Sequence, residues 1–250
     1  MLLEARNLVF RRGRFSLEYI SFTAQPGTIT GIGGRNGSGK STLLRLLYGF
    51  YKPESGDVLV EGRNIRTMSP REISRRISVV NQEVSEPFNF TVSEVVSISG
   101  YSRENGKPAV SDVLSMCGIE HLEHRPFNEI SGGERRLSII AAAIYQDSGI
   151  MLMDEPTAFL DVDKELRVIG IVRKLREQGR NIVLVLHDVN LLYRICDNVV
   201  LLNNGRIVAA GKKEDVMTLD NLRKTYSVEF REVADGGPYR FAPASISESG

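Results

Sequence analysis

One ten-residue stretch, GGRNGSGKST at residues 33–42, constrains the fold of this chain more than any other. It fits the pattern G-x-x-x-x-G-K-[ST], in which the backbone amides of a glycine-rich loop surround phosphate groups. The matching positions are Gly34, Gly39, Lys40 and Ser41. The pattern requires a buried strand before the loop and a helix after it. Residues 28–33 are apolar and β-branched, and residues 43–50 carry leucines at helical spacing, so the sequence predicts a strand–loop–helix unit that binds nucleotide phosphates.

A flexible glycine turn is the alternative interpretation, but it does not require these flanking elements. In a phosphate loop the lysine reaches the terminal phosphates, and the following hydroxyl binds magnesium. We therefore expect the loop to contact phosphate through Gly34, Asn36, Gly37, Ser38, Gly39, Lys40, Ser41 and Thr42.

Composition excludes several classes of protein. The 32 Lys and Arg residues nearly balance the 31 Asp and Glu residues, so the chain lacks the overall basic field common in nucleic-acid-binding proteins. The longest apolar runs, such as residues 182–186, are far shorter than the ~18 residues of a membrane span. The first ten residues do not resemble a secretory signal. Cys117 and Cys196 match no zinc or paired-thiol spacing, which favours two reduced thiols and a cytoplasmic protein.

Strand-like stretches alternate with amphipathic helical stretches along the chain, which predicts an α/β fold with a parallel sheet. The expected elements are two antiparallel strands within 1–30, a strand within 57–65, a helix over 69–77 capped by Ser69, a strand over 77–82, short helices within 84–135, a strand over 149–156, a helix over 163–179, a strand over 181–188, a hairpin over 199–211 turned at Asn204 and Gly205, a helix over 220–228, and a loose tail with one added strand.

Two adjacent carboxylates, Asp154 and Glu155, follow the apolar run IMLM. This places them at the carboxyl end of a buried strand, where open α/β sheets bind their ligands. Side chains alternate in direction along an extended chain, so the two acids can serve different purposes. Asp154 suits magnesium, and Glu155 suits the orientation or deprotonation of an attacking water. Without the phosphate loop, an acidic pair at a strand end would more simply be surface charge.

The phosphate loop and four further motifs resemble those of the ATP-binding-cassette (ABC) ATPases. The resemblance covers nearly the whole chain. Residues 130–134, ISGGE, resemble the family signature LSGGQ, and residues 156–161, PTAFLD, resemble the D-loop. Gln82 occupies the Q-loop position and His187 the switch-histidine position. The resemblance implies a P-loop NTPase (RecA-like) parallel-sheet core with an N-terminal antiparallel β subdomain and an inserted α-helical subdomain. The expected boundaries of this single domain are 1–83 and 149–230 for the core with its β subdomain, 84–148 for the helical subdomain and 231–250 for the tail.

The resemblance also implies a shared mechanism, in which two copies stack head to tail and enclose ATP between them. Ser131, Gly132 and Gly133 of one copy would then offer donors and a helix dipole to the γ-phosphate held by the other. The implied catalytic residues are Lys40, Gln82, Glu155 and His187, the implied metal-binding residues are Ser41, Gln82 and Asp154, and Asp161 is implied to contact the nucleotide. The implied cofactors are ATP and Mg²⁺.

Some positions depart from the family pattern. The usual adenine-stacking aromatic is replaced by the segment RRGRF, so Arg11 or Arg12 could stack on the base, or Phe10 or Phe15 could take the role. Arg35 replaces a common proline, and we expect little effect. Glu134 replaces the signature glutamine, for which we expect an altered rate and not lost activity. His121 and His124 have no third ligand near them in sequence, so we expect exposed histidines and not a metal site.

Several stretches resemble the importer ATPases for iron–siderophore, haem and cobalamin. That resemblance implies partner permease subunits in the membrane, an external solute-binding protein, a place on the inner face of the cell membrane, and a permease coupling helix received near Gln82 and residues 84–110. The linker SRENGKP (102–108) is shorter than usual for the family, which leaves those permease contacts open. The alternatives are a soluble ABC protein that acts as a scaffold or clamp, and an exporter cassette made as a separate chain.

Overall fold

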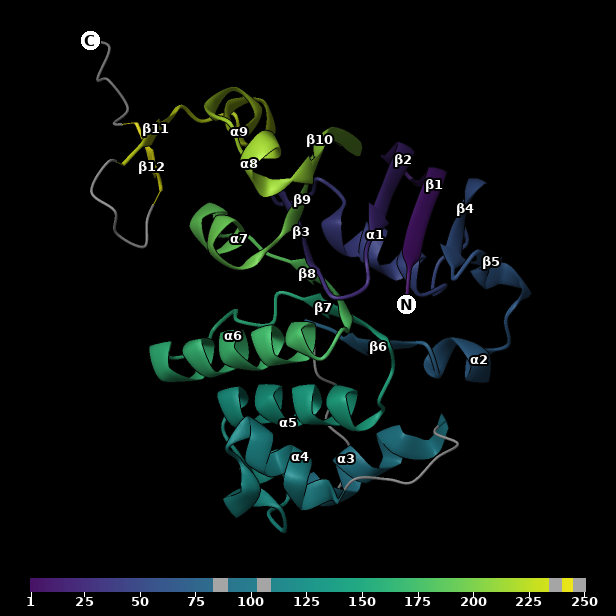
Figure 1. Ribbon diagram of the computed structural model, residues 1–250, viewed down its shortest axis with the longest axis vertical. Coiled ribbons are helices and arrows are strands. Elements are labelled where there is room, and N and C mark those ends of the chain that lie inside the picture. The colour runs from purple at the N-terminus through teal and green to yellow at the C-terminus, as the bar shows by residue number, and fades with distance from the viewer. Residues whose placement is uncertain (83–89, 103–108, 234–239, 245–250) are drawn as a thin grey trace.

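The computed structural model describes residues 1–82, 90–102, 109–233 and 240–244 (Figure 1). Its strands are β1 (Leu3–Arg12), β2 (Phe15–Ala24), β3 (Ile29–Gly34), β4 (Ser55–Val60), β5 (Arg63–Asn64), β6 (Ile77–Val80), β7 (Ile150–Asp154), β8 (Asn181–Val185), β9 (Asn198–Asn203), β10 (Arg206–Lys212), β11 (Phe230–Glu232) and β12 (Phe241–Pro243). Its α-helices are α1 (Lys40–Leu47), α2 (Pro70–Ser74), α3 (Val92–Ser99), α4 (Val110–Cys117), α5 (Gly132–Tyr145), α6 (Val162–Glu177), α7 (Val189–Ile195), α8 (Lys213–Val216) and α9 (Leu219–Tyr226).

The central sheet has six strands in the order β10-β9-β3-β8-β7-β6. All its neighbouring pairs are parallel except β10 with β9, which form the hairpin expected from the sequence. Asn204 and Gly205 both have positive φ at its turn, as a tight hairpin of this kind requires. A second sheet, β2-β1-β4-β5, is antiparallel throughout. The predicted parallel core and antiparallel N-terminal strands are therefore confirmed.

The parallel strands are buried on both faces. Along β7, Ile150 and Leu152 enter one hydrophobic core, whereas Met151 and Met153 enter the other. Because successive side chains of a strand point to opposite faces, a strand covered on both sides must be apolar at every position. One core is shared with α1 and the antiparallel sheet, and the other with α5, α6 and α7. This explains why the buried strands are continuous apolar runs in the sequence.

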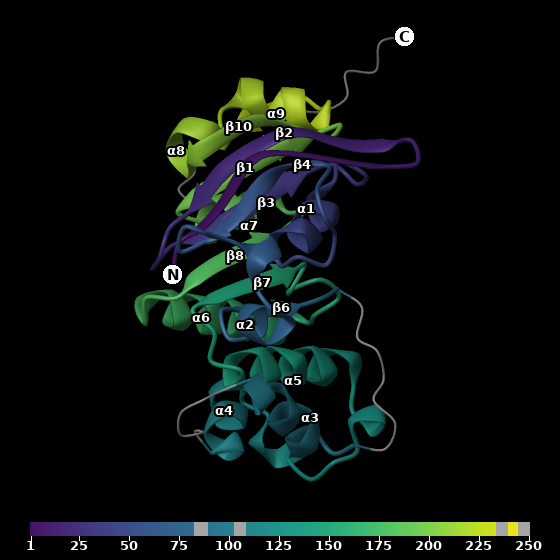
Figure 2. The same ribbon diagram turned by 90° about the vertical axis from the view of Figure 1, so that its right-hand side faces the viewer.

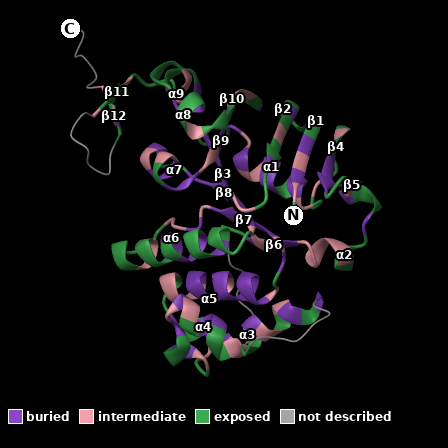
Figure 3. Ribbon diagram, viewed as in Figure 1, coloured by how far each residue is buried: buried purple, intermediate pink, exposed green. Residues whose placement is uncertain are grey.

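A helical region formed by α3, α4 and α5 lies at the end of the molecule opposite the antiparallel sheet (Figure 2). Its longest helix, α5, is buried along most of its length, whereas α6 exposes one face (Figure 3). Capping boxes begin α3 at Thr91 and α5 at Ser131, and left-handed Gly118 ends α4. The exact domain boundaries remain predictions.

Some predicted elements differ in extent. The helix capped by Ser69 ends at Ser74, because the chain from Ile77 onward pairs with β7 in the sheet. The sequence did not predict α7, α8, β5 or β11. In the tail, β12 is the expected added strand, and it pairs with β11. Residues 83–89 and 103–108, which include much of the expected permease surface and the SRENGKP linker, lie outside the described residues. Among the described residues, no helix is both long and apolar enough to cross a membrane.

Candidate functional site

The carboxyl ends of four adjacent parallel strands carry the candidate residues. In the sheet order β3-β8-β7-β6, the phosphate loop follows β3, His187 follows β8, Asp154 and Glu155 end or follow β7, and Gln82 follows β6. Parallel strands end at one edge of the sheet, so segments up to about 150 residues apart in the sequence meet there. The sheet topology thus brings the segments that carry these residues together at one edge of the sheet, beyond the adjacent ends of β3, β8, β7 and β6 (Figures 1 and 2).

A cavity of about 400 Å³ opens at this edge. Its lining combines six predicted phosphate-loop positions, three predicted catalytic positions outside the loop, and Phe15, one of the candidates for adenine stacking. The lining residues are Phe15, Asn36, Gly37, Gly39, Lys40, Ser41, Thr42, Gln82, Glu155 and His187. A cavity of this size is typical of small-molecule sites.

The phosphate loop is shaped by glycines that no other residue could replace without disturbance. Gly34 has φ 148°, and a β-carbon there would lie 2.2 Å from the Leu202 carbonyl oxygen. Lys40 is buried, and its Nζ donates to the carbonyl oxygens of Gly34 at 2.8 Å and Arg35 at 3.0 Å. Burial lowers the pKa of Lys40, while Glu155 and Asp154 act in the opposite direction. The ammonium is therefore held by weak carbonyl acceptors, which phosphate oxygens can replace with stronger, charge-assisted bonds.

Asp154 and Ser41 form an oxygen-rich corner beside the loop. The Ser41 hydroxyl donates to Asp154 Oδ1 at 3.2 Å, and Asp154 is 5% exposed. Burial is the main cause of the raised pKa of Asp154, with Glu155 adding to it and the Ser41 hydrogen bond opposing it. A hydroxyl and a carboxylate next to a phosphate site are the ligands that magnesium prefers. These two residues therefore fit a Mg²⁺ ion bound together with a nucleotide.

Glu155 adopts a conformation that the sequence did not predict. Its φ is 50°, in the left-handed region, so the chain turns after Asp154 instead of remaining extended. Asp154 and Glu155 have different partners, as expected. The predicted cause, alternation of side chains along an extended strand, is wrong, because the chain turns at Glu155. Left-handed backbone costs a non-glycine residue about 1–2 kcal/mol. Its carboxylate pairs with His187 Nε2 through Oε1 and accepts a hydrogen bond from Gln82 Nε2 at 3.3 Å through Oε2.

Arg136 belongs to this site and was missed by the sequence analysis. It is a buried residue of α5, and its guanidinium donates to the backbone carbonyl oxygens of Asn81 and Glu155, the latter at 2.9 Å. A signal was present in the sequence, since Arg136 lies on the same helical stripe as apolar Ile140 and Ala143. A charged residue on a buried stripe indicates a buried and paired cation.

Four candidates for the adenine-stacking residue are distinguished by their contacts. Phe15 lines the cavity. Phe10 is buried and stacks on Tyr51 at 5.2 Å between ring centroids. Arg12 lies over the same tyrosine ring, and Arg11 pairs with Glu54. Of the four side chains, Phe15 is therefore the one in position to contact a bound base.

The signature residues do not line the cavity of this chain. Ser131 and Gly132 are exposed at the start of α5. Glu134, which replaces the signature glutamine, closes a capping box by accepting a hydrogen bond from the Ser131 amide at 2.8 Å. Interaction with the Ser131 side chain, and then with its amide, lowers the pKa of Glu134. Asp161 is also outside the cavity, at the N-cap of α6, and pairs with Lys164 Nζ at 2.8 Å.

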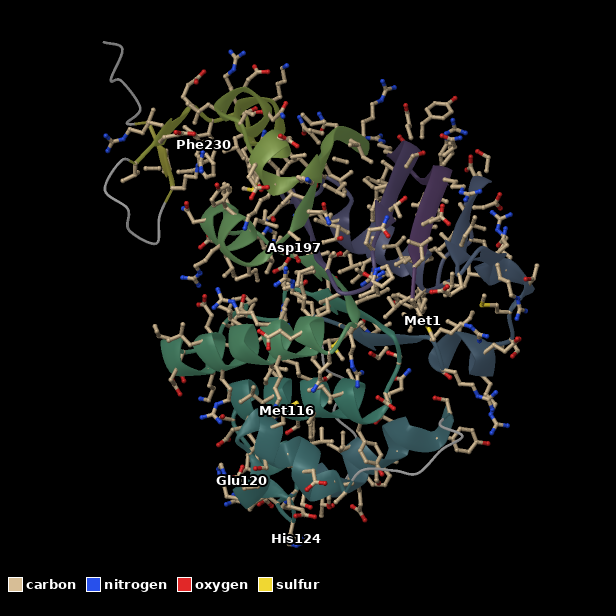
Figure 4. The ribbon with its side chains drawn as sticks, in the orientation of Figure 1. Met1, Met116, Glu120, His124, Asp197 and Phe230 are labelled. Atoms are coloured by element: carbon tan, nitrogen blue, oxygen red, sulfur yellow. The ribbon has the colours of Figure 1, made fainter. Side chains whose placement is uncertain are left out.

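Remaining candidates lie away from the site. His121 and His124 are exposed, as expected, and Figure 4 shows His124 at the outer end of the helical region. Both cysteines are buried as free thiols, and burial raises the pKa of Cys117 to about 12. Neither thiol is suited to reaction as a thiolate.

Comparison with known proteins gives consistent matches. A family model described as "ABC transporter" matches residues 17–158. Hemin import ATP-binding protein HmuV of Bordetella bronchiseptica is 35% identical over 92% of this chain and 93% of its own length. A protein of Bacillus subtilis named "Probable siderophore transport system ATP-binding protein YusV" is 33% identical over 88% of this chain and 83% of its own length. A metal-chelate type ABC transporter, solved in an inward-facing conformation, has a chain 28% identical with a TM-score of 0.82, covering 98% of both chains.

Proposed function

Because this chain belongs to the ABC transporter family, whose ATP-binding proteins are ATPases, we propose that it is the ATP-hydrolysing subunit of an importer for iron–siderophore, haem, cobalamin or a related metal chelate. The observation that carries the proposal is the convergence of a phosphate loop, Gln82 and the paired Glu155 and His187 on one cavity. Relatives named for hemin and siderophore transport support the substrate class.

In the proposed reaction, the loop amides and Lys40 hold the β- and γ-phosphates of ATP, and Phe15 stacks on the adenine. Ser41, Asp154 and Gln82 would hold Mg²⁺. When bound, the ion neutralises charge that develops on the phosphates. Glu155 orients the attacking water and accepts its proton, and His187 keeps the Glu155 carboxylate aimed at the γ-phosphate.

We infer that a complete site needs two copies of the chain. Ser131 and Gly132 are exposed, Gly133 is half-buried, and all three lie outside the cavity formed by their own chain. The free amides at the start of α5 and the Ser131 hydroxyl are suited to a phosphate supplied by a partner. In a head-to-tail dimer, each copy would cover the ATP held by the other, with Asp161 next to the shared interface.

Mixing two inactive variants tests this arrangement. Lys40→Ala removes the phosphate contact, and Ser131→Arg blocks the cap, so each homodimer should be inactive. A mixed dimer retains one site built from an intact loop and an intact cap. The mixture should therefore recover part of the ATP hydrolysis of the unaltered protein. If mixing restores nothing while both variants stay folded, the shared site is excluded.

An apolar groove of about 430 Å³ supports the permease partner. It lies between α1, α2 and β6, the strand that ends just before Gln82, and its lining includes Tyr48, Phe50, Pro70, Ile73 and Val79. Phe50 is 65% exposed. We propose that this groove receives a segment of a membrane permease, which places the chain on the inner face of the membrane and an external solute-binding protein on the other side.

Reconstitution tests the importer assignment against the scaffold and exporter alternatives. The chain should co-purify with an integral membrane protein, and that complex in proteoliposomes should move metal chelate toward the side on which this chain hydrolyses ATP. Movement away from that side indicates an exporter. A chain that hydrolyses ATP but associates with no membrane protein, even when Glu155→Gln blocks hydrolysis, supports the scaffold.

A further inference from the structure

The side chain of Arg136 joins three segments that are distant in the sequence. It projects from α5, is 6% exposed, and donates hydrogen bonds to the backbone carbonyl oxygens of Asn81 and Glu155. Asn81 directly precedes Gln82 at the end of β6, and Glu155 directly follows β7. One guanidinium therefore fixes the backbone beside two of the residues proposed to act on the γ-phosphate and the attacking water.

The Glu155 carbonyl is held at a point where the backbone is strained. The Glu155 φ of 50° is unfavourable for a non-glycine residue. Its carbonyl oxygen accepts from Arg136 Nη2 at 2.9 Å and from the Ala158 amide at 3.1 Å. Strained residues persist only where neighbouring contacts determine the conformation, and Arg136 supplies one of these two contacts. Because this turn directs the carboxylate toward His187 and Gln82, the orientation of Glu155 depends on Arg136.

The electrostatic surroundings favour a fixed position for this cation. Burial lowers the pKa of Arg136, and the nearby carboxylates of Asp154 and Glu155 raise it. A buried guanidinium needs acceptors in a definite geometry, because its donors lie in one rigid plane. The carbonyls of Asn81 and Glu155 meet that need. A simple packing role for the side chain would not require contacts to both of these carbonyls.

We propose that Arg136 is a positioning residue for ATP hydrolysis. It holds Gln82 and Glu155 in a fixed relative position and links both of them to α5, the helix that begins with the signature residues. The inference rests on the proposed function. Ser131, Gly132 and Gly133 lie at the N-cap and first turn of the same helix, α5. When α5 shifts on contact with ATP held by the partner, Arg136 transmits that shift to Gln82 and Glu155 of its own chain. The two ATP sites of a dimer are then coupled through Arg136.

The test compares Arg136→Gln and Arg136→Lys with a matched control, Arg173→Gln, which removes an exposed arginine from α6. We expect Arg136→Gln to lower kcat by about 10- to 100-fold, since small misplacements of catalytic groups have effects of this size. The KM for ATP should stay within about twofold, because the phosphate-loop contacts are unchanged. Arg136→Lys, which keeps the charge but not the fork of donors, should retain an intermediate kcat. The control should match the unaltered protein.

A double-mutant comparison separates positioning from general structural support. In a Glu155→Gln background, Arg136→Gln should cause little further loss of hydrolysis, because both changes act through the same group. The inference is overturned if the losses of hydrolysis caused by the two substitutions multiply. It is also overturned if Arg136→Gln alone lowers kcat, raises KM to a similar extent and lowers Tm. If Arg136→Gln does not fold, Arg136→Lys carries the same comparison. An unaltered protein that fails to hydrolyse ATP contradicts the proposed function, whereas an active protein indifferent to Arg136→Gln contradicts only the role of Arg136.

Discussion

His187 Nε2 pairs with Glu155 Oε1, and this contact joins the ends of β8 and β7 at the floor of the cavity. His187 is 44% exposed, whereas Glu155 is only 11% exposed. The second Glu155 oxygen accepts from Gln82. Both carboxylate oxygens are therefore engaged by neighbouring side chains, and each retains a further lone pair that can accept a hydrogen bond from water.

Glu155→Gln should bind ATP and lose hydrolysis. The amide is nearly the same size as the carboxylate and can still bond to its neighbours, but it cannot accept a proton from water. We expect kcat to fall by at least ~100-fold, the scale of a general-base contribution. The dimer formed with ATP should also persist longer, as gel filtration with ATP and Mg²⁺ would show. Phosphate release at the unaltered rate would remove Glu155 from its assigned role.

Phe15→Ala should weaken ATP binding. Loss of the ring removes a stacking contact of about 1–3 kcal/mol, the range measured for bases on aromatic side chains, so the KM for ATP should rise roughly 5- to 100-fold. Tyr19→Ala is the matched control, since Tyr19 is an aromatic residue on the same strand, is 74% exposed and lies outside the cavity lining. Equal KM values for the two variants would indicate that adenine binds elsewhere.

Asp154→Asn should stabilise the nucleotide-free protein while abolishing magnesium-dependent hydrolysis. Burial raises the folded-state pKa of Asp154 above its unfolded value, so its favourable contribution is present below the unfolded pKa and is lost as the pH rises through the folded pKa. Above the folded-state pKa, the ionised carboxylate therefore destabilises the fold. Removing it should raise Tm by a few degrees, since about 1 kcal/mol shifts Tm by ~2–4 °C in a chain of this size.

The pH dependence provides the control for the Asp154 prediction. The difference in Tm between Asp154→Asn and the unaltered protein should shrink as the pH is lowered through the raised folded-state pKa, because the carboxyl of the folded protein then becomes neutral. A difference that is constant with pH would mean that the charge of Asp154 does not cause the instability.

Phe50→Asp should uncouple the chain from its permease without changing basal hydrolysis. A charged side chain in the apolar groove would have to be desolvated on docking, at a cost of several kcal/mol. Co-purification with the membrane subunit and its stimulation of hydrolysis should both be lost. Tyr19→Asp changes an exposed aromatic outside the groove lining and should retain both. If Phe50→Asp behaves like Tyr19→Asp, the permease docks on another surface.

Asn190→Ala should loosen the C-terminal strand β12. The Asn190 side chain accepts from the amides of Arg240 and Phe241 and donates to the Phe241 carbonyl, with all three distances at 2.9 Å. At roughly 0.5–1.5 kcal/mol for each bond, the free energy of unfolding should fall by about 2–4 kcal/mol. Asn190→Asp keeps the acceptor and loses only the donor, so it should lose less. Thermal unfolding of the two variants measures the difference, and equal Tm values would contradict it.

The sequence by itself determined the local elements of the site. Glycines and a lysine at fixed spacing specify a phosphate loop, because the backbone must approach phosphate closely and Gly34 tolerates no β-carbon. Continuous apolar runs predicted strands buried on both faces, and the acids after IMLM predicted the end of one such strand. These features depend on neighbouring residues, so a short stretch of sequence carries them.

Only the tertiary structure decided which distant groups act together. The strand order set Gln82, Glu155 and His187 side by side, and the left-handed turn at Glu155, which Arg136 supports, gave the carboxylate its direction. Phe15 was likewise distinguished from Phe10 only by which ring reaches the cavity. Such choices depend on packing between segments far apart in the chain, because hydrogen bonds and burial form only once the sheet has brought those segments together.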